Sequence, residues 1–412
     1  MVTGVMNLGF NILAARLFGP VAYGIISSLM ALVTLVSTPT AAIGLATAGW
    51  MADEESHFGL RYSLGQIRLA MLCIGSLIAL GVCLFSMDIS RTLRVNNIFF
   101  VVVAIMTVIP GYTGSAIMGA LQGLKNFFAA GASAALGSLA KLIALVMGMV
   151  LGGTVMAGSV ALVAGSFASW LMSEFSIRSE YKSRSVETGE RPRIFAWSQF
   201  KGLLHKVVGT SALTAGGTVF LNVDILLAKH FLAPNSAGLF AALGSSGRMI
   251  LFATGAIPSV LYPSLISGKS SLASFRLLLL AQGITALICL AGCAIYILDP
   301  RLVVMLLFGR EFVGITPYLF EYGLAFSFYA LASVFLVYLL YQETRWIWAY
   351  AILGGMAEIV ILSIWHHSIL EFTWGVLLFF TLLFVVSGLH VGRFGLTLVK
   401  VEHDRRKESI RA

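Results

Sequence analysis

The chain has 412 residues, of which 58% are hydrophobic and only 11% are charged, and its mean hydropathy is +0.93. This composition excludes a soluble globular domain and is typical of a polytopic membrane protein. The net charge of +9 comes from 27 Lys and Arg residues against 18 Asp and Glu residues. Membrane topology accounts for that excess, as shown below, so no nucleic-acid partner is expected.

Successive apolar runs predict an all-α protein with about twelve transmembrane helices. Proline residues within these runs, at positions 39, 110, 258 and 263, predict bends in the helices that contain them. The predicted helices cover residues 1–18, 22–48, 67–86, 97–118, 129–151, 154–173, 203–229, 235–265, 272–298, 314–340, 346–364 and 370–392.

The basic residues predict the orientation of these spans. If both termini are cytoplasmic, the inner segments carry 19 of the 27 Lys and Arg residues, the outer segments carry six, and two lie within spans. Such a bias follows the positive-inside rule. The sequence therefore predicts a multi-pass inner-membrane protein with cytoplasmic N- and C-termini.

A sequence echo indicates internal duplication. Residues 13–24 (LAARLFGPVAYG) and residues 227–238 (LAKHFLAPNSAG) each end an apolar run with a basic residue, a small residue and a proline, and a new run follows. Six spans lie on each side of a polar segment, so the two halves are expected to be parallel repeats. The expected organisation is an N-terminal lobe (1–173), a cytoplasmic linker (174–202), a C-terminal lobe (203–392) and a basic cytoplasmic tail (393–412).

Two basic residues lie near the middle of predicted spans, where an uncompensated charge is costly. Lys141 and Arg248 each share a helical face with small residues, which suits a water-filled cavity or close helix packing. One hypothesis is that both cations bind a phosphate or pyrophosphate group in a central cavity. The alternative is that each neutralises an acid of the bundle, for which Asp224 and Glu358 are available.

The same two acids are candidates for coupling transport to a proton or a sodium ion. Asp224 follows Asn222 near the outer end of its span, so it also suits a polar rim or a partner for a basic residue. Arg16 lies at the end of the first span, where it is expected to bond the last carbonyl groups before Gly19 and Pro20. A cavity-facing role for Arg16 stays open.

No pattern of residues predicts catalysis. The predicted outer loops are at most about 15 residues long and hold no nucleophile–base pair. The four cysteines lie inside apolar runs, and no Cys/His spacing indicates a metal site. An enzyme is therefore not expected, nor is a metal or another cofactor.

Several segments resemble the Wzx-type oligosaccharide-lipid flippases of the MOP superfamily. The first is Ala-Arg-Leu-Phe-Gly-Pro-x-x-Tyr-Gly at 15–24, and the second is Gly-Ala-Leu-Gln-Gly-Leu-Lys-Asn-Phe at 119–127. The others are Leu-Asn-Val-Asp at 221–224 with Pro234 and Gly238, Leu-Tyr-Pro at 261–263, and Leu-Leu-Phe-Gly at 306–309. Each match is short, and the specificity comes from their order along most of the chain.

The resemblance implies a transporter of two six-helix lobes forming a V, as in MATE-like proteins of the superfamily. It would flip undecaprenyl-pyrophosphate-linked oligosaccharide repeat units across the bacterial inner membrane by alternating access, for O-antigen lipopolysaccharide, exopolysaccharide or capsule biosynthesis. Its partners would be that lipid-linked oligosaccharide, membrane lipids, and polysaccharide polymerase and chain-length proteins. Arg248, Lys141 and Arg16 would supply the cavity cations. A MATE-like multidrug or organic-cation antiporter is the alternative, and there Asp224 and Glu358 would matter instead.

Overall fold

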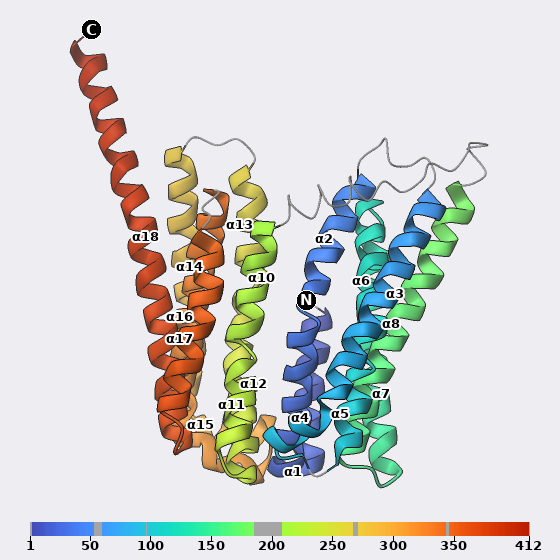
Figure 1. Ribbon diagram of the computed structural model, residues 1–412. Coiled ribbons are helices and arrows are strands. Elements are labelled where there is room, and N and C mark those ends of the chain that lie inside the picture. Colours follow the sequence, from blue (N-terminus) through green and yellow to red (C-terminus); the bar gives the residue numbers. More distant parts are fainter. Residues whose placement is uncertain are drawn as a thin grey trace. The chain divides into compact units, whose positions relative to one another are not determined.

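The computed structural model describes residues 2–52, 60–95, 97–184, 208–266, 271–342 and 346–411. All regular secondary structure in these ranges is helical, which confirms the all-α prediction and satisfies the backbone within apolar surroundings. Figure 1 shows the helices, with α1 Val2–Val36, α2 Pro39–Ala52, α3 Leu60–Leu84, α4 Ser86–Thr92, α5 Ile98–Ile105, α6 Val108–Gly123, α7 Phe127–Val150, α8 Val155–Arg184, α10 Val208–Phe220, α11 Val223–Phe231, α12 Pro234–Thr254, α13 Ala256–Ile266, α14 Ser271–Leu298, α15 Pro300–Leu307, α16 Leu319–Tyr341, α17 Trp346–Ile364 and α18 Ile369–Arg411.

Within the described residues, eleven helices are long and apolar enough to cross a membrane, so the protein is a multi-pass membrane protein. The first of them, Thr3–Val36, is folded in two at Gly19, whose φ of 71° is left-handed. The hydroxyl of Tyr23 donates to the amide oxygen of Asn11 at 3.1 Å, whereas a straight helix would separate these residues by about 18 Å. The turn predicted between residues 18 and 22 is therefore present, and the first helix supplies two of the predicted spans.

Three of the predicted bends are observed as breaks between helices. The chain leaves helical geometry just before Pro39, between α5 and α6 ahead of Pro110, and between α12 and α13 ahead of Pro258. Pro263 instead lies inside α13. A further break separates α10 from α11 at Asn222, which no proline or glycine predicted.

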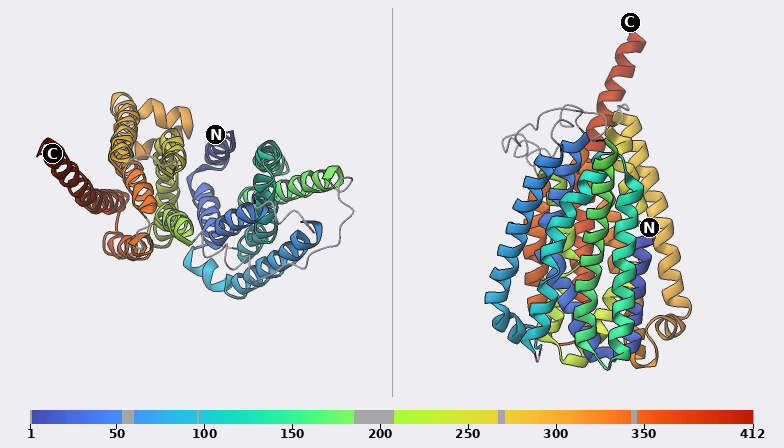
Figure 2. Two further views of the ribbon diagram at one scale, coloured as in Figure 1. Left: turned by 90° about the horizontal axis from the view of Figure 1, so that it is seen from above. Right: turned by 90° about the vertical axis from the view of Figure 1, so that its right-hand side faces the viewer.

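The chain divides into two compact units, Met1–Ala241 and Ala242–Ala412. In the first unit, α2, α3 and α6 pack around a core that includes Trp50, Leu64 and Leu121, and α7 packs along α8. In the second unit, α16 is the central helix and packs against α14 and α18. Figure 2 shows α15 running across the helices of this unit rather than along them.

The helix ends repeat along the chain with the interval of the sequence echo. Helices α3 and α14 end at Leu84 and Leu298, and α8 and α18 begin at Val155 and Ile369. Both pairs are 214 residues apart, as are the starts of the short helices α4 and α15. The internal duplication therefore extends over most of the structure.

The predicted lobe boundaries stay a prediction. Helix α8 continues through Glu174 to Arg184, and the rest of the predicted linker, residues 185–202, lies outside the described residues. Helix α18 continues through the predicted basic tail to Arg411.

Candidate functional site

Lys141 is the most deeply placed of the predicted cavity cations. It lies in the middle of α7 with 9% of its surface exposed. Its Nζ donates to the side-chain oxygen of Asn7 in α1 at 2.5 Å and lies 4.5 Å from the centre of the Phe10 ring. The ammonium group is thus held between an amide oxygen and the negative face of an aromatic ring.

Small residues bring the neighbouring helix close to Lys141, as the sequence predicted. A Cβ atom added to Gly165 of α8 would lie 2.8 Å from Cβ of Lys141 and 2.9 Å from the carbonyl oxygen of Gly137. A Cβ atom at Gly137 would lie 2.6 Å from Cβ of Ser169. The helices α7 and α8 therefore cross in near backbone contact, and this crossing fixes the position from which the Lys141 side chain reaches α1.

A chain of hydrogen bonds extends from Lys141 along α1. The Asn11 side-chain nitrogen donates to the carbonyl oxygen of Asn7 at 2.8 Å, and the Tyr23 hydroxyl donates to the Asn11 side-chain oxygen. Asn7, Asn11 and Tyr23 were not predicted as site residues, because the predicted candidates within the spans were all charged. The spacing of four residues between Asn7 and Asn11, which places two amides on one helical face, was the available signal.

In the described part of the first unit, Lys141 has neutral partners. No described carboxylate of that unit lies within ion-pair distance of its Nζ, so the alternative in which Asp224 neutralises it is not supported. The alternative partner Glu358 belongs to the second unit, and that pairing stays a prediction. A positive charge held only by neutral groups in an apolar bundle is expensive and is stabilised by an anion that approaches it. The Lys141–Asn7–Phe10 cluster therefore has the chemistry of an anion site.

The other predicted cations lie elsewhere. Arg16 is exposed on α1, nine residues and about 13 Å along the helix axis from Asn7. It is on the last turns before Gly19, as its predicted capping role requires. Arg248 belongs to the second unit, where it is half-buried on α12 next to Gly247, which packs against the ring of Phe326.

Both candidate coupling acids are deeply buried. Asp224 is 1% exposed in the first turn of α11, and its carboxylate accepts a hydrogen bond from the backbone N–H of Ile225 at 2.8 Å. Glu358 is fully buried in α17, near the phenol of Tyr329 in α16. Asp224 lies in the first unit and Glu358 in the second. Within the described residues, no three His, Cys, Asp or Glu side chains gather as metal ligands.

The fold is similar to those of solved transporters of the MOP superfamily. The chain is similar to a multidrug resistance MATE family transporter in an inward-facing conformation, with a TM-score of 0.73 and 14% identity, over 97% of this chain and 95% of that one. It is also similar to the lipid II flippase MurJ in an inward closed conformation, with a TM-score of 0.71 and 14% identity, over 95% of this chain and 86% of that one.

A third similar structure is a MOP superfamily transporter from Pyrococcus furiosus, described as having a binding pocket of reversed polarity. Its TM-score is 0.63 and its identity 16%, over 97% of this chain and 93% of that one. At these identities the likeness establishes the fold alone. No family model and no curated protein matches the sequence.

Proposed function

We propose that this protein is a transporter of the bacterial inner membrane that flips undecaprenyl-pyrophosphate-linked oligosaccharides by alternating access. The observation that carries the proposal is Lys141, a cation buried at 9% exposure and bound to a neutral amide and a ring rather than to an acid. Such a group attracts a phosphate or pyrophosphate. The similarity of the fold to those of MOP transporters, among them a lipid flippase, also supports this proposal.

A buried cation suits the transport of a charged, lipid-linked sugar through the membrane. A pyrophosphate-linked sugar cannot enter hydrocarbon without losing its hydration, and each uncompensated charge costs several kcal/mol there (roughly 2.5–3.5 on insertion scales). A fixed cation on the path replaces part of that hydration. Arg248 on α12 remains the predicted second cation, and O-antigen, exopolysaccharide and capsule repeat units are the expected cargo. The N- and C-termini are expected on the cytoplasmic side.

The experiment is translocation of a fluorescent lipid-linked oligosaccharide by the purified protein in vesicles. Lys141→Met and Arg248→Ala are each expected to lower the initial rate about tenfold or more, because each removes a charge-assisted interaction of about 1.5–3 kcal/mol. Arg91→Ala is the matched control, since its side chain is 74% exposed and, within the described residues, its ion pair is with Asp88 at 3.8 Å. Unchanged rates in both cation variants would remove this proposal.

The buried acids favour a second candidate, a MATE-like antiporter for drugs or organic cations. Asp224 and Glu358 are 1% and 0% exposed, and buried carboxylates are the groups that would attract a cation and exchange it for a proton or sodium. Drug resistance of cells that express the protein, with Asp224→Asn and Glu358→Gln as variants, tests it. Resistance that depends on both acids and not on Lys141 would favour the antiporter.

A further inference from the structure

The two echoing turns of the duplicated sequence meet in space. Gly24 follows the first turn and Gly238 follows the second, and both belong to the first unit. A Cβ atom added to Gly24 would lie 2.9 Å from both Cα and N of Gly238. A Cβ atom added to Gly238 would overlap the carbonyl group of Pro20. The backbones of α1 and α12 therefore touch with no space for any side chain.

Two hydrogen bonds span the same region from the segment between α4 and α5. The guanidinium of Arg94 donates to the carbonyl oxygen of Leu232 at 3.2 Å, and Nδ1 of His230 lies 3.0 Å from the carbonyl oxygen of Thr92. Residues 92–94 belong to the first repeat and residues 230–232 to the second. The two bonds thus tie the repeats together next to the Gly24–Gly238 contact.

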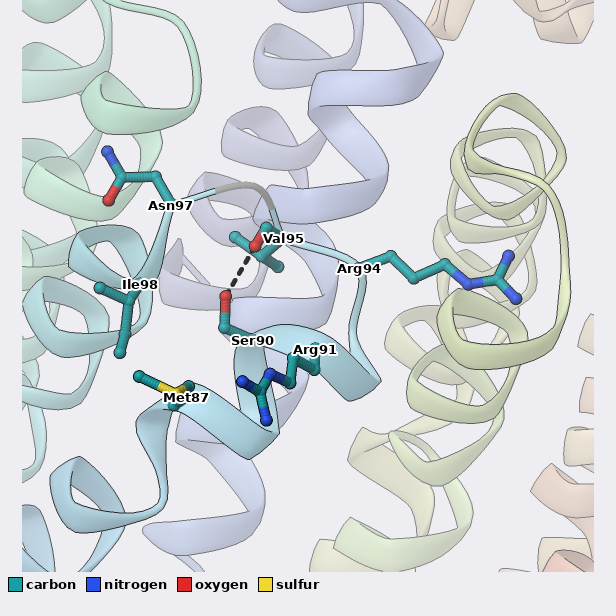
Figure 3. Close-up of a pocket in the computed structure, with 7 residues that line it drawn as sticks. All are labelled: Met87, Ser90, Arg91, Arg94, Val95, Asn97 and Ile98. Atoms are coloured by element: carbon teal, nitrogen blue, oxygen red, sulfur yellow. Dashed lines mark hydrogen bonds between the residues drawn. The ribbon is translucent and has the colours of Figure 1, made fainter.

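Arg94 has an unusual backbone conformation at the turn that ends α4. Its φ of 49° is left-handed, which is uncommon for a residue with a side chain. The turn is fixed by Ser90, whose hydroxyl donates to the carbonyl oxygen of Val95 at 2.6 Å, beside a cavity of about 510 Å³. Figure 3 shows Arg94 reaching away from Asn97 and Ile98, toward the yellow-green helices that include α11 and α12.

The positive charge of Lys229 opposes the contact that Arg94 makes with Leu232. Lys229, in the last turn of α11, is only 2% exposed and lies close enough to Arg94 for their positive charges to repel each other. A contact stabilised by two hydrogen bonds and opposed by charge repulsion has a small net stability, which is what a contact that must open and close requires.

We propose that Arg94 and His230 form a latch that holds the Gly24–Gly238 contact closed, and that release of this latch opens this end of the substrate path during transport. Only the opening of the substrate path during transport rests on the proposed function. The latch itself is a statement about an equilibrium between closed and open contacts, and that equilibrium can be measured without any substrate.

The test measures the distance between spin labels at Arg91→Cys and Asn235→Cys in the full chain, with the four native cysteines replaced. Both positions are exposed and lie on opposite sides of the latch. One short distance is expected for the parent protein. The double variant Arg94→Ala, His230→Ala is expected to raise the population with a longer distance about tenfold or more, since two hydrogen bonds are lost. Gly238→Ala is expected to abolish the short distance.

Gly9→Ala is the matched control, because a Cβ atom there has no neighbour within 4 Å. Its distance distribution should equal that of the parent. The latch is disproved if the double variant keeps the parent's short distance. Translocation assays on the parent and the same variants separate the two proposals. A changed distance in the variants of a parent that does not transport the sugar supports the latch and removes the proposed substrate.

Discussion

The Nζ atom of Lys141 lies 2.5 Å from the side-chain oxygen of Asn7, on a different helix and 134 residues away in sequence. The amide oxygen orients the ammonium group without cancelling its charge. A carboxylate at the same place would hold the lysine equally well, but the pair would then be neutral. The identity of residue 7 therefore decides whether this pair of side chains carries a net positive charge.

Asn7→Asp is expected to keep the protein stable but to weaken its binding of an anionic ligand. The new carboxylate should pair with Lys141, so the thermal unfolding midpoint should equal or exceed that of the parent, whereas the affinity for a lipid-linked pyrophosphate should fall about tenfold or more. Asn7→Ala removes the acceptor altogether and should lower the free energy of unfolding by about 1–3 kcal/mol. Thermal unfolding in detergent and binding of the labelled lipid measure both effects. Equal affinity of Asn7→Asp and the parent would contradict the anion site.

Glu174→Gln is expected to destabilise the end of the first unit where α3 and α8 meet. The carboxylate of Glu174 accepts a hydrogen bond from Nε of Arg178 at 2.7 Å and also forms an ion pair with Arg68. Glu174 itself is only 8% exposed. Its loss removes this carboxylate as a charge partner from both guanidinium groups. Because Arg178 is mostly exposed, the cost should be about 1–3 kcal/mol, below the roughly 3–5 kcal/mol of fully buried pairs.

Asp88→Asn provides the comparison for Glu174→Gln. Asp88 and Arg91 are 3.8 Å apart, and both side chains are more than 70% exposed. Removing this surface pair should change the free energy of unfolding by less than about 0.5 kcal/mol. Similar losses in the two variants, measured by thermal or denaturant unfolding, would mean that the Glu174 cluster adds no specific stability.

The sequence predicted the helices well because each depends on local information. Apolar runs of sufficient length must form helices in a membrane, and Gly19–Pro20 and Pro39 mark where the chain leaves helical geometry. The break at Asn222 was missed for a physical reason. It relies on polar side chains, with the Asn222 side-chain nitrogen donating to the carbonyl oxygen of Thr218 at 2.7 Å, rather than on a residue that excludes helix.

The candidate site was only partly predictable. Lys141 was found because a mid-span charge is unusual, but its partner Asn7 depends on how α1 and α7 pack. The duplication could not supply the missing partner, because the position 214 residues after Lys141 is Gly355 and the position 214 residues after Asn7 is Leu221. The repeat keeps the helices and the touching glycines, whereas Lys141 has no charged counterpart in the second half.

Gly119→Ala is expected to weaken the contact between α2 and α6. The segment that resembles the flippase motif begins with Gly119 and has a second glycine four residues later, Gly123, which places both on one face of α6. A Cβ atom at Gly119 would overlap the carbonyl group of Gly44, and one at Gly123 would overlap that of Ala48. A backbone cannot move aside as a side chain does, so the variant should lose about 1–3 kcal/mol of stability or more.

Gly111→Ala on the same helix is the control and should have the opposite sign. A Cβ atom there has no neighbour within 4 Å, so the substitution leaves the packing unchanged and adds up to about 1 kcal/mol through the better helix propensity of alanine. Thermal unfolding of both variants in the same detergent gives the comparison. If Gly119→Ala is as stable as Gly111→Ala, the two helices do not rely on backbone contact, and the glycines of this motif would need an explanation other than packing.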